Sequence, residues 1–266
     1  MAAIEVFNRY EKKFIIRADV CNELQQELRQ YMVSDEYNKD FKPYSICNIY
    51  YDTVDNNLIR TSLLKPAYKE KLRLRAYGVP TADDIVFLEI KKKFCGLTNK
   101  RRIRIGLMDA YDFLEKKRVP KADYINQQIL SELNYFVHFY NPEPKLYLAY
   151  DRYAYFSKEN RHLRVSIDLN IRARRTDLRL ECGDFGERIV PEHMRIMEIK
   201  AEHSIPVWLA ALLSKYHVYS TGFSKYGTEY QNYLWSRLEK GENACSNHYF
   251  PQPILHRQAL HSSQQQ

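Results

Sequence analysis

Charged residues occupy every second position in several short segments of this 266-residue chain. The clearest segment runs from residue 69 to residue 75, where Leu72 and Leu74 separate the charges. Because the side chains of an extended strand point alternately to its two faces, one face of this strand is cationic. That face carries Lys69, Lys71, Arg73 and Arg75. A row of lysine and arginine side chains is suited to binding the oxygens of a phosphate-rich molecule.

The same alternation recurs in other segments, with basic residues in excess. The residues on these charged faces are Glu89, Lys91, Lys93, Lys100, Arg102, Arg104, Arg164, Ser166, Asp168, Arg172, Glu198 and Lys200. One such strand alone is more often an exposed edge, but the recurrence favours charged faces that point together into a water-filled space. Because so many facing cations repel one another, they are tolerable only around a polyanion. We therefore predict a polar, tunnel-like barrel for a phosphate-rich ligand.

Two further groups of charged residues each allow two interpretations. Near the N-terminus, alternation places Arg9, Glu11 and Lys13 on one face of a strand, which is either another wall of the tunnel or an ordinary N-terminal strand. Glu198 precedes Lys200 by two residues. This spacing suits a divalent cation beside phosphates, since such cations prefer carboxylate oxygen, but an internal salt bridge is an equal alternative.

Any phosphate must be bound by side chains, because the chain has eight glycines and contains neither GxxxxGK[ST] nor GxGxxG. Ser224 precedes a helical stretch and could be its N-cap, while its neighbour Lys225 could close one mouth of the tunnel. The eight histidines show no HExxH or HxH spacing. We therefore expect neither a histidine metal site nor a covalent nucleophile.

The composition favours an anionic partner and a reducing compartment. The formal net charge is +8, which suits nucleotide, polyphosphate, nucleic acid or a membrane surface. The five cysteines are widely separated without CxxC spacing, so we expect neither a disulfide framework nor a zinc site, and a cytoplasmic location. We expect no membrane span in this chain, because no run of about 18 apolar residues occurs.

Hydrophobic periodicity predicts an α+β fold. We expect strands at 5–16, 44–52, 67–77, 84–94, 99–106, 144–156, 162–173 and 193–201. Eight antiparallel strands are enough to close a barrel. We expect flanking helices at 18–32, 109–117, 122–137, 206–216 and 226–239. One domain should span residues 1–240, and the composition of residues 241–266 indicates a loosely ordered tail.

Eight short motifs occur along the chain, and their combination in this order is specific for one family, although each motif alone is weak. They are RYEKKF, LRLRAYG, FLEIKKK, NKRRIRI, YDRYAYF, LRVSIDLN, MEIKA and GFSKYGTEYQ. From about Phe7 to Tyr230 the chain resembles the VTC domain, the polyphosphate polymerase domain of the vacuolar transporter chaperone complex. That domain lies within the triphosphate tunnel metalloenzyme superfamily. The chain lacks the SPX domain and membrane helices of the eukaryotic polymerase, so it resembles the stand-alone, prokaryotic type.

The resemblance implies a set of site residues. Those implied to be catalytic are Arg73, Arg75, Lys91 and Lys225. Those implied to bind phosphate are Lys13, Lys100, Tyr150, Arg152, Arg164, Lys200 and Ser224. Glu198 would hold a divalent cation, manganese or magnesium. The wider superfamily carries ExExK on its first strand, whereas here Arg9 stands at the first glutamate position, which favours the polymerase branch over a plain triphosphatase.

The resemblance implies transfer of the γ-phosphate of ATP to a growing polyphosphate chain inside the tunnel. Two alternatives stay open: a triphosphate hydrolase of the same fold, and a non-catalytic polyphosphate- or nucleotide-binding module. Nucleic acid ranks lower, because no strand face shows a stacking pattern of aromatic residues. The expected partners are therefore ATP and inorganic polyphosphate, while a membrane-protein partner and the oligomeric state are left open.

Overall fold

The computed structural model describes residues 6–95, 97–202 and 204–240, and the side chains of residues 6–9 are not among what it describes. The tail expected at 241–266 lies outside the described residues, as does the side chain of Arg9. Cys21, Cys47, Cys95 and Cys182 are free thiols, and Cys245 lies outside the described part.

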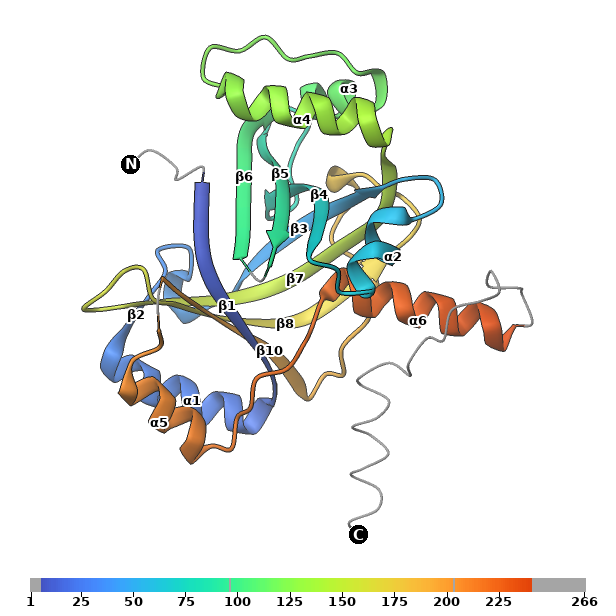
Figure 1. The fold of residues 1–266 in the computed structure, drawn as a ribbon. Coiled ribbons are helices and arrows are strands. Elements are labelled where there is room, and N and C mark those ends of the chain that lie inside the picture. Colours follow the sequence, from blue (N-terminus) through green and yellow to red (C-terminus); the bar gives the residue numbers. More distant parts are fainter. Residues whose placement is uncertain (1–5, 96, 203, 241–266) are drawn as a thin grey trace.

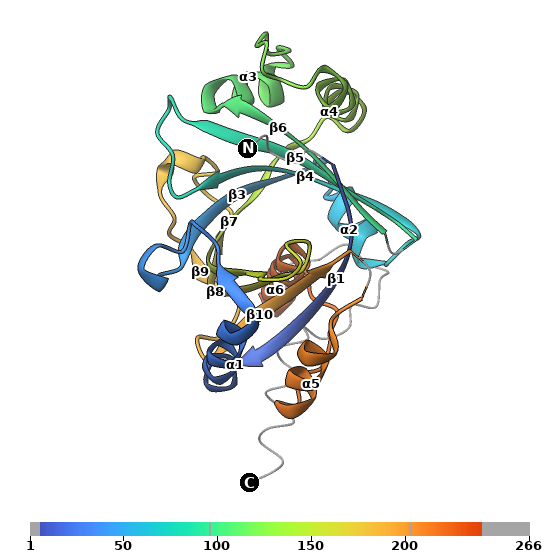
Figure 2. The same cartoon turned by 90° about the vertical axis from the view of Figure 1, so that its left-hand side faces the viewer.

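Eight antiparallel strands close into a barrel, as the alternation predicted. They are β1 (Val6–Arg17), β3 (Tyr44–Asp52), β4 (Tyr68–Tyr77), β5 (Ile85–Phe94), β6 (Leu97–Gly106), β7 (Glu143–Ser157), β8 (Arg164–Arg174) and β10 (Met194–Ala201). Around the barrel the order is β7-β3-β4-β5-β6-β1-β10-β8, and the pairing of β8 with β7 completes the circle. Figure 2 shows this ring of strands close to end-on. Two short strands, β2 (Met32–Ser34) and β9 (Glu187–Arg188), which the sequence did not indicate, pair with β7 and β8.

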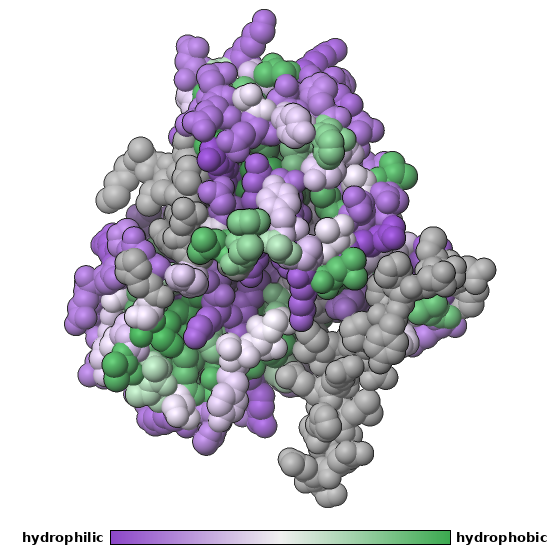
Figure 3. Space-filling view, in the orientation of Figure 1, coloured by the Kyte–Doolittle hydropathy of each residue, from purple (hydrophilic) through white to green (hydrophobic). Residues whose placement is uncertain are grey.

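Helices cover the outer, apolar faces of the strands (Figure 1). On one side α3 (Leu107–Lys116) and α4 (Gln127–Tyr140) pack against β3 to β6. On another, α1 (Ala18–Tyr31) and α5 (Val207–Lys215) pack against β8 and β10, where Figure 3 shows apolar side chains at the lower left. Leu72 and Leu74 are fully buried in the first of these clusters. The expected division between an apolar outer face and a charged inner face is therefore confirmed on β4.

Two helices differ from the expectation. The helix expected at 122–137 begins only at Gln127, because the side chain of Asn126 caps it by accepting from the Ile129 amide, and it continues to Tyr140. The sequence did not indicate α2 (Asn57–Leu63), which begins where both carboxylate oxygens of Asp52 accept backbone amides, at 2.8 Å from Leu58 and 2.9 Å from Ile59. The other helices match, and α6 spans Lys225–Glu239.

Arg172 does not share the inner face with Arg164, Ser166 and Asp168, contrary to the expectation. Asn170 adopts a left-handed conformation with φ of 53°, and the register with β7 shifts nearby. The faces exchange beyond this irregularity, because each added residue reverses the alternation. Arg172 accordingly reaches Asp151 and Asp184, and Ile171 joins an apolar cluster with residues of α6.

This third apolar cluster joins α2 and α6 to the side of the barrel formed by β3, β7, β8 and β10. It includes Tyr226 and Tyr230 of α6, Ile59 of α2, and residues of β3, β7, β8 and β10. The hydroxyl of Tyr226 donates to Asp52 at 3.0 Å, so the capping carboxylate of α2 also holds α6. No helix in the described part of the chain is long and apolar enough to cross a membrane.

We predict that Leu74→Ala lowers the free energy of unfolding by about 2–5 kcal/mol, since it removes a fully buried side chain and leaves a cavity beneath the helices. Urea denaturation measures the loss. Val207→Ala is the control, because Val207 is 86% exposed on α5 and its truncation should change little. Equal midpoints for the two variants would contradict the assignment of the outer face of β4 to the core.

Candidate functional site

A cavity of about 2310 Å³ occupies the interior of the barrel. Along β4 its wall extends from Lys69 at one end to Tyr77 at the other. Among the residues that the structure describes, seventeen lysines and arginines but four acidic residues line it. Both ends are accessible to solvent, because Lys65 beside one mouth and Tyr77 at the other are exposed. The interior is therefore a cationic tunnel, as the alternating strands predicted.

One wall of the tunnel is organised by a buried carboxylate, Glu89 on β5. Arg73 lies 2.7 Å from one of its oxygens and Lys100 2.5 Å from the other, while Arg75 is 3.8 Å away. Burial alone would raise the pKa of Glu89, but the charges of Lys100, Arg75 and Arg73 outweigh it and hold the pKa well below its usual value. Glu89 therefore stays ionised and fixes three cations on adjacent strands.

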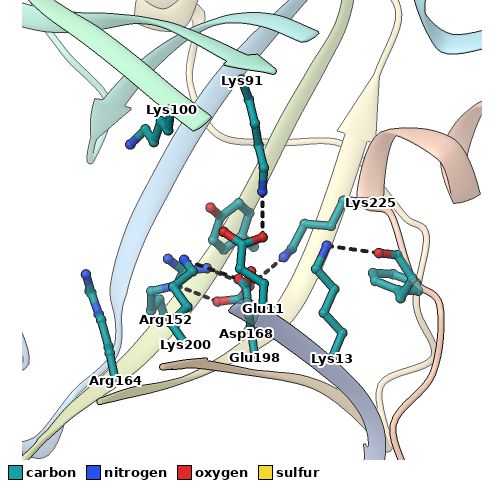
Figure 4. Close-up of polar contacts among 12 residues, drawn as sticks. Glu11, Lys13, Lys91, Lys100, Arg152, Arg164, Asp168, Glu198, Lys200 and Lys225 are labelled. Carbon is teal, nitrogen blue, oxygen red and sulfur yellow. Dashed lines mark hydrogen bonds and ion pairs between the residues drawn. The ribbon is translucent and has the colours of Figure 1, made fainter. Parts of the chain in front are cut away.

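The facing wall is organised in the same way by Asp168 on β8. Arg152 donates to both of its oxygens, at 2.6 and 2.8 Å, and Lys225 at the start of α6 lies 2.5 Å away, as Figure 4 shows. Burial opposes the charge of this carboxylate, but Arg152 and Lys225 outweigh burial and lower the pKa of Asp168 to about 2. The two walls thus present cations from opposite sides, each set fixed by one buried acid.

Between these walls, β1 and β10 bring mixed charges into the tunnel (Figure 4). Glu11 accepts from Lys91 at 2.6 Å, and Glu198 lies 3.5 Å from Lys200. Lys13 donates to the Phe223 carbonyl at 2.9 Å. Burial would raise the pKa of Glu198, but Lys200, Lys13 and Lys91 hold it well below its usual value, while burial lowers the pKa of Lys200 to about 8. The salt bridge that the sequence left open is therefore present.

The donors at Glu11 and Glu198 fit a divalent cation that also binds phosphate. No cluster of three histidine, cysteine, aspartate or glutamate side chains occurs in the described part of the chain, so the protein supplies no complete metal cage there. Magnesium-type cations usually take one or two carboxylates and complete their shell with water and phosphate oxygens. Glu198 and Glu11 both line the tunnel and are ionised there, which meets that requirement.

Two hydroxyl groups join the tunnel wall. The Tyr150 hydroxyl accepts from Arg75 at 2.9 Å, and Lys225 lies 4.4 Å from the centre of its ring. Ser224 caps α6 by accepting from the Gly227 amide at 3.1 Å. The same hydroxyl also accepts from Lys71 at 2.9 Å. Ser224 is therefore the N-cap of α6, and its side chain also lines the tunnel.

Arg164 lies apart from this centre, although it also lines the tunnel (Figure 4). Its guanidinium contacts Asp35 at 3.0 Å and the Tyr44 hydroxyl at 3.3 Å. The fold thus brings all twelve site residues expected from the sequence to one cavity. It also places Arg164 near the end where Tyr44 and Tyr77 meet.

Lys71 is a tunnel residue that was not among the expected site residues, although the alternation of β4 had placed it on the cationic face. None of the salt bridges formed by the described residues involves Lys71, whose ammonium donates to Ser224 and faces the ring of Tyr226. Burial, followed by repulsion from Lys13 and Lys91, lowers the pKa of Lys71 to about 7. The roles of Glu89 and Asp168 as anchors were also missed, since they depend on contacts between strands.

A closed antiparallel barrel with a cationic interior and helices on its outer faces defines a protein of the triphosphate tunnel type. The family model described as the VTC domain matches residues 8–234. The chain belongs to the VTC domain family, in agreement with the resemblance drawn from its motifs.

The chain is similar to solved structures at low sequence identity. A protein from Bacillus halodurans described as a candidate adenylate cyclase is 13% identical, with a TM-score of 0.53 over 83% of this chain and 96% of that chain. A candidate adenylyl cyclase from Hippeastrum with a dominant triphosphatase activity is 14% identical, with a TM-score of 0.45 over 92% of this chain and 100% of that chain. No curated protein matches the sequence.

We predict that binding of tripolyphosphate at about pH 8.5 takes up protons, and that Lys71→Met removes about one of them. With a pKa of about 7, Lys71 is mostly neutral at that pH in the protein without ligand. A bound polyanion favours the charged form and raises this pKa, so binding must protonate the side chain, and affinity should fall as the pH rises above 7.

Calorimetric titrations in buffers of different ionisation enthalpy measure this uptake. Lys92→Met is the control, since Lys92 follows the tunnel residue Lys91 but lies on the outer face near Glu132. Uptake that is identical in the wild type and the Lys71 variant would show that Lys71 does not meet the polyanion.

Proposed function

We propose that this chain is a metal-dependent polyphosphate polymerase, which transfers the γ-phosphate of ATP to an inorganic polyphosphate chain. The observation that carries the proposal is the opposition of two cationic walls across one tunnel. Arg73, Arg75 and Lys91 line it from β4 and β5, and Arg152 and Lys225 from β7 and α6. Phosphoryl transfer needs mainly alignment of the acceptor with the leaving group and neutralisation of charge, which fixed cations supply.

In the proposed reaction a terminal oxygen of the polyphosphate chain attacks the γ-phosphorus of ATP. A bond forms between that oxygen and the phosphorus, while the bond to the bridging β,γ-oxygen breaks and its electron pair leaves with ADP. Arg73, Arg75 and Lys91 would grip the triphosphate, and Lys225 would neutralise charge from the facing wall. The residues that would hold the phosphates on either side are Lys13, Lys71, Lys100, Tyr150, Arg152, Arg164, Lys200 and Ser224.

Glu198, with Glu11 beside it, would hold the divalent cation, manganese or magnesium. When bound, such a cation offsets part of the negative charge of the phosphates. Lys91 and Lys200 already contact these carboxylates. Both lysines lie where they would also be available to phosphate oxygens.

Retention of the product favours polymerase over hydrolase. The buried acids Glu89 and Asp168 neutralise only part of the surrounding charge, so the tunnel keeps a cationic excess along its length. A long polyanion would therefore be held between additions, as a polymerase needs, whereas a hydrolase must release its products. ATP as the donor is consistent with the cytoplasmic location expected from the cysteines.

We predict that the purified protein, given ATP and manganese, forms polyphosphate ladders with an equal amount of ADP, and that EDTA stops the reaction. A gel stained for polyphosphate detects the ladders, and ADP and free phosphate are measured in the same tube. Free phosphate without ladders would favour a triphosphate hydrolase. Tight binding of polyphosphate or nucleotide, with neither ladders nor free phosphate formed, would favour a non-catalytic binding module.

We predict that Lys91→Ala lowers polymerase activity by roughly 100-fold or more, because it removes a fixed cation from the reacting phosphates. Lys92→Ala is the matched control, since the next side chain on β5 points outward to Glu70 and Glu132 and should leave activity nearly unchanged. Circular dichroism and thermal melting check that both variants are folded. Wild-type turnover by a folded Lys91 variant would contradict the assignment of this wall to the reaction.

A further inference from the structure

Four aromatic side chains surround one mouth of the tunnel. They are Tyr37 in the loop after β2, Tyr44 of β3, Tyr77 of β4 and Phe87 of β5, and all four line the cavity. The rings of Tyr37 and Tyr77 stack with centroids 5.6 Å apart at 12°, and Phe87 meets Tyr77 edge-on at 5.7 Å. The ring of Tyr44 lies beside both tyrosines, with its centroid 5.7 Å from that of Tyr37 and 6.1 Å from that of Tyr77. The four residues form one connected aromatic mouth.

This aromatic mouth presents ring surface to solvent. Tyr37 is 55% exposed and Tyr77 is 41% exposed, although both rings touch aromatic neighbours. Arg102 adds a planar cation, since its guanidinium carbon lies 4.7 Å from the centre of the Phe87 ring. Exposed aromatic and guanidinium planes at the edge of a polar cavity are the surfaces on which nucleobases stack.

The opposite mouth has a different chemistry. Lys69 pairs directly with Lys93 across β4 and β5, and Lys65 lies close enough to repel Lys69. All three line the cavity. This lysine mouth suits a chain of phosphates without a base, because its side chains offer ammonium groups to the ligand.

The order of side chains along β4 matches the order of groups in a nucleoside triphosphate. The inward positions are Lys69, Lys71, Arg73, Arg75 and Tyr77, spaced roughly 7 Å apart along the strand. An aromatic ring thus follows the last guanidinium of the phosphate-binding row, and Phe87 pairs directly with Arg75 on the neighbouring strand. A ligand whose phosphates lie against Arg73 and Arg75 would bring its base to these rings.

We propose that Tyr37, Tyr44, Tyr77 and Phe87 form a nucleobase subsite that takes the purine ring of the nucleotide whose phosphates lie in the tunnel. This inference rests on the proposed function in one respect, the use of a nucleotide as a tunnel ligand. Stacking tolerates any base, since each has a π-face, but the larger ring system of a purine covers more of the aromatic surface. The donor nucleotide therefore binds at the aromatic mouth, and the lysine mouth holds only phosphates.

The test compares two ligands that share a triphosphate and differ in the base. The double variant Tyr37→Ala, Tyr77→Leu should weaken binding of β,γ-imido-ATP by about 10- to 100-fold while leaving binding of tripolyphosphate unchanged. Calorimetry on the full chain measures both affinities without turnover. Tyr77→Phe should bind like the wild type, because it keeps the ring. Tyr68→Leu is the matched control, at the other end of β4 and outside the cavity lining.

An equal loss of affinity for both ligands in the double variant would overturn the subsite, since it would show a general effect on the mouth of the tunnel. So would unchanged affinity for β,γ-imido-ATP, or a wild type that binds neither ligand. Failure of the polymerase proposal looks different: the wild type would bind β,γ-imido-ATP more tightly than tripolyphosphate but make no polyphosphate from ATP, and the subsite would stand.

Discussion

Repulsion among like charges in a confined space is the constraint on which this structure depends. The barrel carries lysines and arginines inward from nearly every strand, and without countercharges they would drive the walls apart. Glu89 and Asp168 meet this constraint from opposite sides, because each is buried behind the cations that it holds. The cations are thereby fixed in place, while the N–H groups that face the tunnel stay available to a ligand. A polyanion, the class of ligand proposed above, would complete the neutralisation and would thereby link the stability of the site to its ligand.

The anchoring acids do not contact every inward-facing cation, and burial lowers the pKa of lysines with and without such a partner. Arg73 and Lys100 have a carboxylate within hydrogen-bonding distance, whereas Lys71 rests on the hydroxyl of Ser224. Burial, with repulsion from Lys13 and Lys91, lowers the pKa of Lys71 to about 7. Arg73 stays charged whatever its partner, because a guanidinium is a much stronger base than an ammonium group.

Most of the fold could be predicted from the sequence, because the side-chain alternation of a strand is a local property. Leu72 and Leu74 separate the charges of β4 at a period of two, so the strand and its two faces could be predicted without knowing its neighbours. Arg172 could not be placed in this way, since the left-handed Asn170 reverses the alternation. The capping of α2 by Asp52 was also hidden, because its amide partners follow in a short segment without a clear helical period.

The site was predicted in its composition but not in its internal pairing. Twelve residues could be assigned to the tunnel from alternation and motifs, yet nothing in the sequence pairs Glu89 with Lys100 or Asp168 with Lys225, since those contacts cross between elements. The aromatic mouth was invisible for the same reason. Tyr37, Tyr44, Tyr77 and Phe87 come from four separate segments, so no single strand shows an aromatic row.

Because β8 pairs with β7, the wall of the tunnel has no seam. A linear polymer that occupies such a ring cannot leave sideways and must slide out lengthwise, so protein and polymer are related as a bead is to a thread. If the proposed polyphosphate is that polymer, every phosphate must pass each cation in turn before the chain is released, and a longer chain takes longer to withdraw. A bulky group at each end of the thread would lock the bead in place without any chemical bond between them.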